Sequence, residues 1–215
     1  MPAVTEALAA SGLQAQTWAE NDRLHVEYDP LATGTGYVRP AVLLEFGARA
    51  TGEPWESLPV VCDAAAHVPQ LVFPSAVPQV MRIERTFWEK ATAIHVFCAQ
   101  GRFRGAERFA RHWHDVARLG DGGHASRAIA DPDIAIAVAH HKTAFFPEKD
   151  RDGKIIDYAA AVSGGLRLVP DGAALDLLAD DYNRMVDDGL LLDEAETFDL
   201  LVEQCRAIEE HANRR

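Results

Sequence analysis

Lys90 is a candidate functional residue because of its type and its position in the sequence. It lies in MRIERTFWEKATAIHVFCAQ, residues 81–100. Apolar residues recur there every three or four positions, a spacing that predicts a helix with one buried face, namely Ile83, Phe87, Ala91, Ile94 and Cys98. Lys90 falls about 60° from Phe87, at the edge of this stripe, and Glu84 lies at the other edge. Its ammonium group either extends to water or points into a cleft, where a fixed cation would bind an anion.

A second predicted helix follows in GRFRGAERFARHWHDVARL, residues 101–119. Its apolar stripe comprises Ala106, Phe109, Ala110, Trp113, Val116 and Ala117. Arg111 and Asp115 lie off the stripe, four residues apart, and the spacing alone favours a solvated salt bridge between them. The adjacent His112 and His114 resemble metal ligands in type, but residues two apart on a helix do not face one another.

Glu45 is a carboxylate within an apolar strand. YVRPAVLLEFGAR, residues 37–49, alternates Val42, Leu44 and Phe46 on one face with Leu43 and Glu45 on the other. A carboxylate in this position either lies on the exposed face of a sheet or holds a metal ion. A second acidic pair, Asp131 and Asp133 after Gly122 and Gly123, imitates the turn and paired carboxylates of nucleotidyltransferases. Pro132 separates that pair, so a turn and a helix N-terminus are the better interpretation.

The charge of the chain is unevenly distributed. The net charge is −12, which argues against wholesale coating of nucleic acid or of an anionic membrane. Residues 82–118, however, carry eight Lys and Arg against four Asp and Glu, whereas residues 171–210 carry thirteen acidic residues and two arginines. Contacts with a polyanion are therefore expected in the first of these stretches.

We predict an α+β fold with two domains. Residues 1–80 should hold a helix over 2–20 interrupted near Gly12, a β-hairpin of strands 23–29 and 37–49, and a proline-rich connector with a short strand at 71–73. Residues 81–215 should form a helical domain that includes a helix at 134–146 and, after residue 157, helices interrupted at 164–170. Asp193 and Glu196 are expected to form a capping box.

Three widely spaced cysteines and the absence of a signal or membrane-spanning pattern favour a cytoplasmic protein that does not enter a membrane.

Several of these segments together resemble the AbiEii/AbiGii family of nucleotidyltransferase toxins. The segments span nearly the whole chain in the family's order: VRPAVLLEFGAR at 38–49, RTFWEKATAIH at 85–95, RFARHWHDVARL at 108–119, VAHHKTAFF at 138–146, GGLRLVP at 164–170 and DYNRM at 181–185. The resemblance implies a polymerase-β-like nucleotidyltransferase sheet, present here as a remnant, followed by a mostly α-helical C-terminal domain.

The resemblance also implies an activity and a set of site residues. The family is associated with transfer of a nucleotidyl group from an NTP to RNA such as tRNA, with Mg²⁺, in abortive-infection and toxin–antitoxin systems of phage defence. By resemblance, Lys90 contacts the triphosphate, Asp115 is the acidic residue of an RHYYDL-like motif, and Glu45 is a metal-ligating carboxylate. Arg111 and His112 in the same motif, and Arg102 downstream of the lysine, are further candidates for nucleotide binding. A cognate antitoxin is the expected protein partner.

The family's GG[ST] turn and D-x-D strand precede the region that this sequence covers. We therefore expect the chain to represent the C-terminal part of a longer toxin and to be inactive alone. The alternative is a catalytically dead module that binds a nucleotide, RNA or an antitoxin, and a third hypothesis is an all-helical structural protein with an incidental hairpin.

Overall fold

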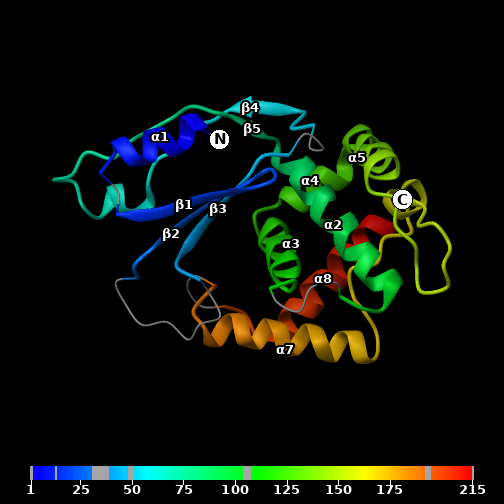
Figure 1. The fold of residues 1–215 in the computed structure, drawn as a ribbon. Coiled ribbons are helices and arrows are strands. Elements are labelled where there is room, and N and C mark those ends of the chain that lie inside the picture. The colour runs from blue at the N-terminus through cyan, green and yellow to red at the C-terminus, as the bar shows by residue number, and fades with distance from the viewer. Residues whose placement is uncertain are drawn as a thin grey trace. The chain divides into compact units, whose positions relative to one another are not determined.

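A computed structural model describes residues 2–12, 14–30, 39–47, 51–103, 108–191 and 195–214. The chain divides into two compact units, the first made of Met1–Thr51 with Met185–Asp193 and the second of Gly52–Arg184 with Glu194–Arg215. The mixture of helices and small antiparallel sheets confirms the predicted α+β class (Figure 1). The predicted functional boundary near residue 80 stays a prediction.

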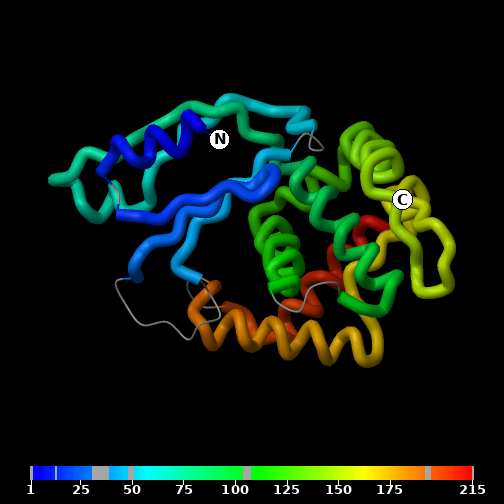
Figure 2. The backbone as a smooth tube through the Cα atoms, in the orientation of Figure 1, coloured from blue at the N-terminus to red at the C-terminus, as the bar shows by residue number. Residues whose placement is uncertain are grey.

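The first unit contains a helix and a three-stranded antiparallel sheet. Helix α1 (Pro2–Ala10) is followed by β1 (Ala15–Glu20), β2 (Arg23–Tyr28) and β3 (Ala41–Glu45), with β2 in the centre, as the tube in Figure 2 shows. Leu24 and Val26 of β2 are buried, as expected for alternate positions of a half-buried strand. The β2–β3 pairing confirms the predicted hairpin. Residues 37, 38, 48 and 49 of the predicted second strand lie outside the described residues.

The prediction of a helix through residue 20 is wrong, because residues 15–20 form β1. Trp18 of this strand stacks on His25 of β2, with ring centroids 4.8 Å apart. Asn21 has a φ of 52° at the turn between these strands, a conformation that asparagine tolerates better than most residues. Pairing with β2 therefore outweighs the helical propensity of the alanine-rich N-terminal segment.

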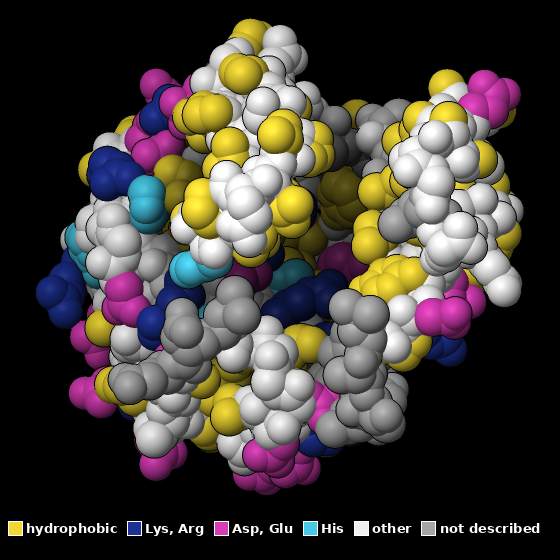
Figure 3. Space-filling model, turned by 90° about the vertical axis from the view of Figure 1, so that its left-hand side faces the viewer, with side chains coloured by type: hydrophobic (Ala, Val, Ile, Leu, Met, Phe, Trp, Pro, Cys, Tyr) yellow, Lys and Arg dark blue, Asp and Glu magenta, His cyan; other side chains and the backbone are white. Residues whose placement is uncertain are grey.

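The second unit begins with a two-stranded ribbon. Strand β4 (Trp55–Ser57) pairs with β5 (Gln79–Met81), and a 3₁₀ turn, η1 (Asp63–Ala66), lies between them in sequence. The prediction of a short strand at 71–73 is wrong, because these residues form no strand. Exposed hydrophobic side chains occur in the segment between these two strands, including Val61 and Val72, and others are visible on the molecular face in Figure 3.

Helices make up the rest of the second unit. They are α2 (Ile83–Gln100), α3 (Arg111–Asp121), α4 (His124–Ala130), α5 (Pro132–Phe145), α6 (Tyr158–Val162), α7 (Ala173–Asp187) and α8 (Phe198–Asn213), of which α7 ends in the first unit. Helix α2 packs against α3, α4, α5 and α6. Its predicted stripe is buried at Phe87, Ala91, Ile94 and Cys98, so the predicted central helix is confirmed. The stripe predicted for the second helix is equally buried from Phe109 to Ala117, but the predicted start of that helix at residue 101 is wrong, because α3 begins at Arg111. Ala106 lies outside the described residues.

Two helix starts test the cap predictions. The Asp131 side chain accepts a hydrogen bond from the N–H of Ile134 and Pro132 begins α5, which confirms a turn and helix N-terminus there. Helix α8 instead begins after Thr197, whose hydroxyl accepts from the N–H of Leu200. The predicted start at Asp193 is therefore wrong, although Asp193 itself lies outside the described residues.

All three cysteines belong to the second unit, and two of them are buried in it. Burial raises the pKa of Cys98 and of Cys205 to about 12, and Cys62 on the ribbon is exposed. None of the helices in the described ranges combines the length and the apolar composition that a membrane crossing needs.

The segment 164–170 is held by side chains from α2, α3 and α8. The indole N–H of Trp113 donates to the carbonyl of Leu168 at 2.6 Å, and Glu209 accepts from the N–H of Val169 at 3.1 Å. On the α2 side, Nδ1 of His95 accepts from the N–H of Arg167 at 3.1 Å. Burial, with a smaller contribution from the charge of Arg167, lowers the pKa of His95 to about 4.

We expect His95 to make the stability of the protein depend on pH. Between about pH 4 and 6.5 the unfolded chain protonates this histidine and the folded chain does not, so stability is lost as the pH falls through that window. The loss due to His95 should be about 2 kcal/mol, after allowance for its partial exposure. Urea unfolding of wild type and His95→Asn at several pH values measures it, since asparagine keeps an acceptor but does not titrate. Exposed His140→Asn is the control, and equal acid dependence in wild type and His95→Asn would contradict the prediction.

Candidate functional site

Lys90 and Asp115 are brought together by the packing of α2 against α3. The Nζ atom of Lys90 lies 2.6 Å from Oδ2 of Asp115, and 28% and 39% of the two side chains are exposed. The structure therefore joins two of the predicted site residues. It also shows that Asp115 pairs across helices, whereas the sequence spacing suggested Arg111, the residue four positions earlier on the same helix.

A cavity of about 680 Å³ adjoins this ion pair, which is within the size range of small-molecule sites. We call it the Lys90 cavity. Its lining comes from β4, β5, α2, α3, α4 and the segments beside them, all within the second unit: Glu56, Leu58, Val80, Met81, Ile83, Thr86, Lys90, Asp115, Arg118, Leu119, Gly122 and His124. Lys90 thus lines a concave site, as the second of the two alternatives left open by its position on the helix requires.

Arg118 provides a second cation at the Lys90 cavity. Its Nη2 atom lies 2.7 Å from Oε2 of Glu196 and 3.1 Å from Oδ2 of Asp121. The Glu196 side chain is only 4% exposed, so the guanidinium is tied to a fixed partner. Arg118 was not predicted as a site residue, yet its position three residues after Asp115 places both residues on the same face of α3.

The other predicted nucleotide-binding residues lie outside the set that lines this cavity. His112 is half-buried beside Phe97, with ring centroids 6.1 Å apart. Burial, followed by the charges of Lys90 and Arg111, lowers the pKa of His112 to about 4, so its ring is neutral at physiological pH. Arg111 begins α3 and Arg102 follows α2, and both are exposed. That these three residues contact a nucleotide stays a prediction.

Glu45 belongs to the first unit and pairs with a strand neighbour. It lies opposite Arg23 in the sheet, and its Oε1 atom is 2.9 Å from Nε of Arg23, with both side chains more than half exposed. Mg²⁺ needs several oxygen ligands in a near-octahedral arrangement. Within the described ranges no three His, Cys, Asp or Glu residues cluster so that they could hold a metal ion. The described residues thus do not fit a metal, and a cleft shared by Glu45 and Lys90 stays a prediction.

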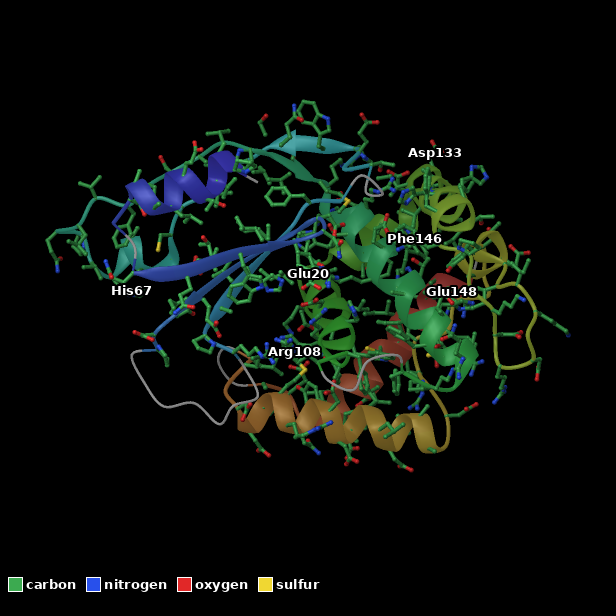
Figure 4. The ribbon with its side chains drawn as sticks, in the orientation of Figure 1. Glu20, His67, Arg108, Asp133, Phe146 and Glu148 are labelled. Atoms are coloured by element: carbon green, nitrogen blue, oxygen red, sulfur yellow. The ribbon has the colours of Figure 1, made fainter. Side chains whose placement is uncertain are left out.

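A smaller cavity of about 180 Å³ lies where α2, α5 and α6 meet, and Phe146 and Glu148, both labelled in Figure 4, are among the residues that line it. Its cation, Lys142, pairs with Glu89 as Lys90 pairs with Asp115, with Nζ 2.6 Å from Oε2, and it also lies 4.9 Å from the centre of the Phe146 ring. The size of this cavity falls below the usual range for nucleotide-sized ligands. The Lys90 cavity is therefore the stronger candidate site.

Comparison with known proteins supplies one match. A family model described as "Nucleotidyl transferase AbiEii toxin, Type IV TA system" matches residues 3–204. Searches among curated proteins and among solved structures found no match. The matched range includes Lys90, Asp115 and every other residue that lines the Lys90 cavity.

Proposed function

The chain belongs to the AbiEii nucleotidyl transferase toxin family of type IV toxin–antitoxin systems, and from this we propose that the Lys90 cavity binds the triphosphate of an NTP substrate. The proposal extends to transfer of a nucleotidyl group from that NTP to an RNA acceptor such as tRNA. Membership of a toxin–antitoxin family also suggests an antitoxin as the protein partner.

The observation that carries the proposal is the placement of Lys90. Its ammonium group lies at a cavity large enough for a nucleotide, and Asp115 holds it there at 2.6 Å. A lysine is a compact point charge that suits phosphate oxygens, and Arg118 adds a guanidinium to the same lining. The two cations would supply hydrogen-bond donors for the phosphate oxygens, while Glu56 and Asp115 in the same lining balance their charge.

The residues of the cavity can be given roles in the proposed reaction. Attack of an acceptor hydroxyl oxygen on the α-phosphorus forms a new P–O bond, breaks the bond to the β-phosphate oxygen, and releases pyrophosphate and a proton. Lys90 would stabilise the negative charge that accumulates on the departing pyrophosphate. Asp115 would keep the ammonium group of Lys90 in place.

The RNA acceptor is supported by the distribution of charge. Arg102, just after α2, and Arg111, at the start of α3, are exposed, and both belong to the basic stretch at residues 82–118 within an otherwise acidic chain. A local cationic surface attracts a polyanion even when the net charge is negative.

The proposal predicts which phosphate of the NTP reaches the acceptor. Contrary to the inactivity expected from the sequence, the purified protein with a tRNA pool should transfer label from an α-labelled NTP to the RNA. It should not transfer label from the same NTP labelled on the γ-phosphate. Transfer of γ-label would indicate phosphoryl transfer instead. Binding of NTP without any transfer of α-label would contradict the enzyme and favour a nucleotide-binding module.

A further inference from the structure

Seven residues of α2, an axial rise of about 10 Å, separate Lys90 from the residue that lines the other end of the Lys90 cavity. Ile83 and Lys90, seven residues apart on α2, both line the cavity, as do Asp115 and Gly122 on α3. The two helices run in opposite directions (Figure 1), so the Ile83 end of α2 faces the Gly122 end of α3. A ligand with its triphosphate at Lys90 would thus place its other end near Ile83.

This second end offers apolar contacts with one polar ring among them. Leu58, Val80, Met81 and Ile83 line the cavity there, beside the imidazole of His124. Apolar surface with few, well-placed polar groups is what a flat aromatic ligand requires. This end is thus mainly apolar, with Glu56, which lies opposite Val80 in the ribbon, as its charged residue, whereas Lys90, Asp115 and Arg118 lie at the other end.

A buried carboxylate and an arginine fix the orientation of His124. The Glu84 side chain is 10% exposed, and its Oε1 atom accepts from Nε of Arg127 at 3.3 Å. The Nη2 atom of Arg127 in turn contacts Nδ1 of His124. Because a guanidinium can only donate, Nδ1 must be the acceptor and the neutral ring carries its proton on Nε2.

Two further observations support this arrangement. Burial acts to raise the pKa of Glu84, but hydrogen bonds from a backbone N–H and from Arg127, with the charge of Arg82, outweigh burial and lower that pKa. Glu84 therefore stays ionised as the partner of Arg127. A Cβ atom on Gly122 would lie 2.6 Å from Cδ2 and 3.0 Å from Nε2 of His124, so only glycine leaves room for the ring where it stands.

We propose that this end of the Lys90 cavity is a nucleobase subsite, in which Nε2–H of His124 donates a hydrogen bond to the base. Glu84 and Arg127 act as positioning residues that set the orientation and the tautomer of His124. The subsite rests on the proposed function, because the position of the base follows from a triphosphate bound at Lys90.

The test compares a ligand that has a base with one that lacks it. Binding of the four NTPs and of inorganic tripolyphosphate is measured by calorimetry on the full chain. Wild type should bind at least one NTP more tightly than tripolyphosphate. His124→Ala should weaken binding of that NTP about threefold to tenfold, the worth of one neutral hydrogen bond, and leave tripolyphosphate binding unchanged. His140→Ala, at an exposed histidine on α5, is the matched control and should change neither affinity.

A second measurement addresses the positioning residues. Long-range ¹H–¹⁵N spectra of wild type should show His124 protonated on Nε2, and Arg127→Gln should reduce that tautomer while weakening NTP binding more than tripolyphosphate binding. His124→Gln, which restores an N–H donor, should recover part of the NTP affinity.

The outcomes separate this inference from the proposed function. If wild type binds neither NTP nor tripolyphosphate, the function of the cavity is wrong and the subsite falls with it. If tripolyphosphate binds but His124→Ala leaves NTP affinity unchanged, only the subsite is wrong. Equal losses for both ligands would make His124 a phosphate contact and would also overturn the inference.

Discussion

Replacing Lys90 with alanine is expected to lower nucleotidyl transfer about 100-fold to 1,000-fold, the usual loss when one fixed group that stabilises developing charge is removed. The fold should remain, because a partly exposed ion pair such as Lys90 with Asp115 contributes about 1 kcal/mol or less to stability. Rates with α-labelled NTP, measured beside urea unfolding curves, give both quantities. Lys154→Ala, at an exposed lysine elsewhere in the second unit, is the control and should keep full activity.

An exchange of the two charges distinguishes a functional lysine from a structural ion pair. The double variant Lys90→Asp with Asp115→Lys can re-form the ion pair between α2 and α3. Its lysine, however, is on α3 and no longer on α2, so the ammonium group approaches the cavity from a different position. If the pair only holds the helices together, the double variant should recover activity that each single variant loses. We expect it to recover stability without recovering transfer, and full recovery of transfer would contradict the role given to Lys90.

Replacing Asp181 with alanine is expected to cost about 3–5 kcal/mol of unfolding free energy, the largest stability effect that we predict. Asp181 lies on α7 and is fully buried. Its two carboxylate oxygens accept from the backbone N–H groups of Arg108 and Ala110, each at 2.8 Å. Ala110 is the N-cap residue of α3, so Asp181 satisfies its backbone N–H and orders the turn that leads into this helix.

The substitution would leave two backbone donors without the carboxylate that now accepts from them. Arg108, labelled in Figure 4, has a φ of 62°, which is uncommon for a residue with a side chain and is supported by this contact. Urea unfolding measures the loss, and Asp180→Ala, at the exposed neighbouring position, should change stability by less than about 0.5 kcal/mol. A loss below about 1 kcal/mol for Asp181→Ala would show that other groups satisfy these donors.

The sequence predicts those elements whose signals are local. The three-and-four spacing of Phe87, Ala91 and Ile94 defines a helix and its buried face before any partner is known, and Asp131 with Pro132 marks a helix start in the same way. Pairings between distant segments leave weaker traces. The β4–β5 pairing joins residues more than twenty positions apart, and β1 forms because β2 lies beside it.

The site shows the same limit. Lys90 was recognisable as a residue at the border of a buried stripe, but its contact with Asp115 depends on how two helices pack. Glu196 was predicted to cap a helix, whereas its side chain binds Arg118. His124 was missed because a single histidine after a glycine pair indicates only a turn, and its contacts with Glu84 through Arg127 cross forty sequence positions.

The unequal burial of the cysteines provides a way to follow opening of the second unit without any substitution. In the folded chain an aqueous thiol reagent should modify Cys62 alone, whereas denaturant should make all three sulfurs reactive. Cys98 and Cys205 lie on α2 and α8, so the slow appearance of their reactivity under native conditions would report transient separation of these helices from their neighbours. Slower modification in the presence of NTP would then measure how strongly a nucleotide suppresses that opening.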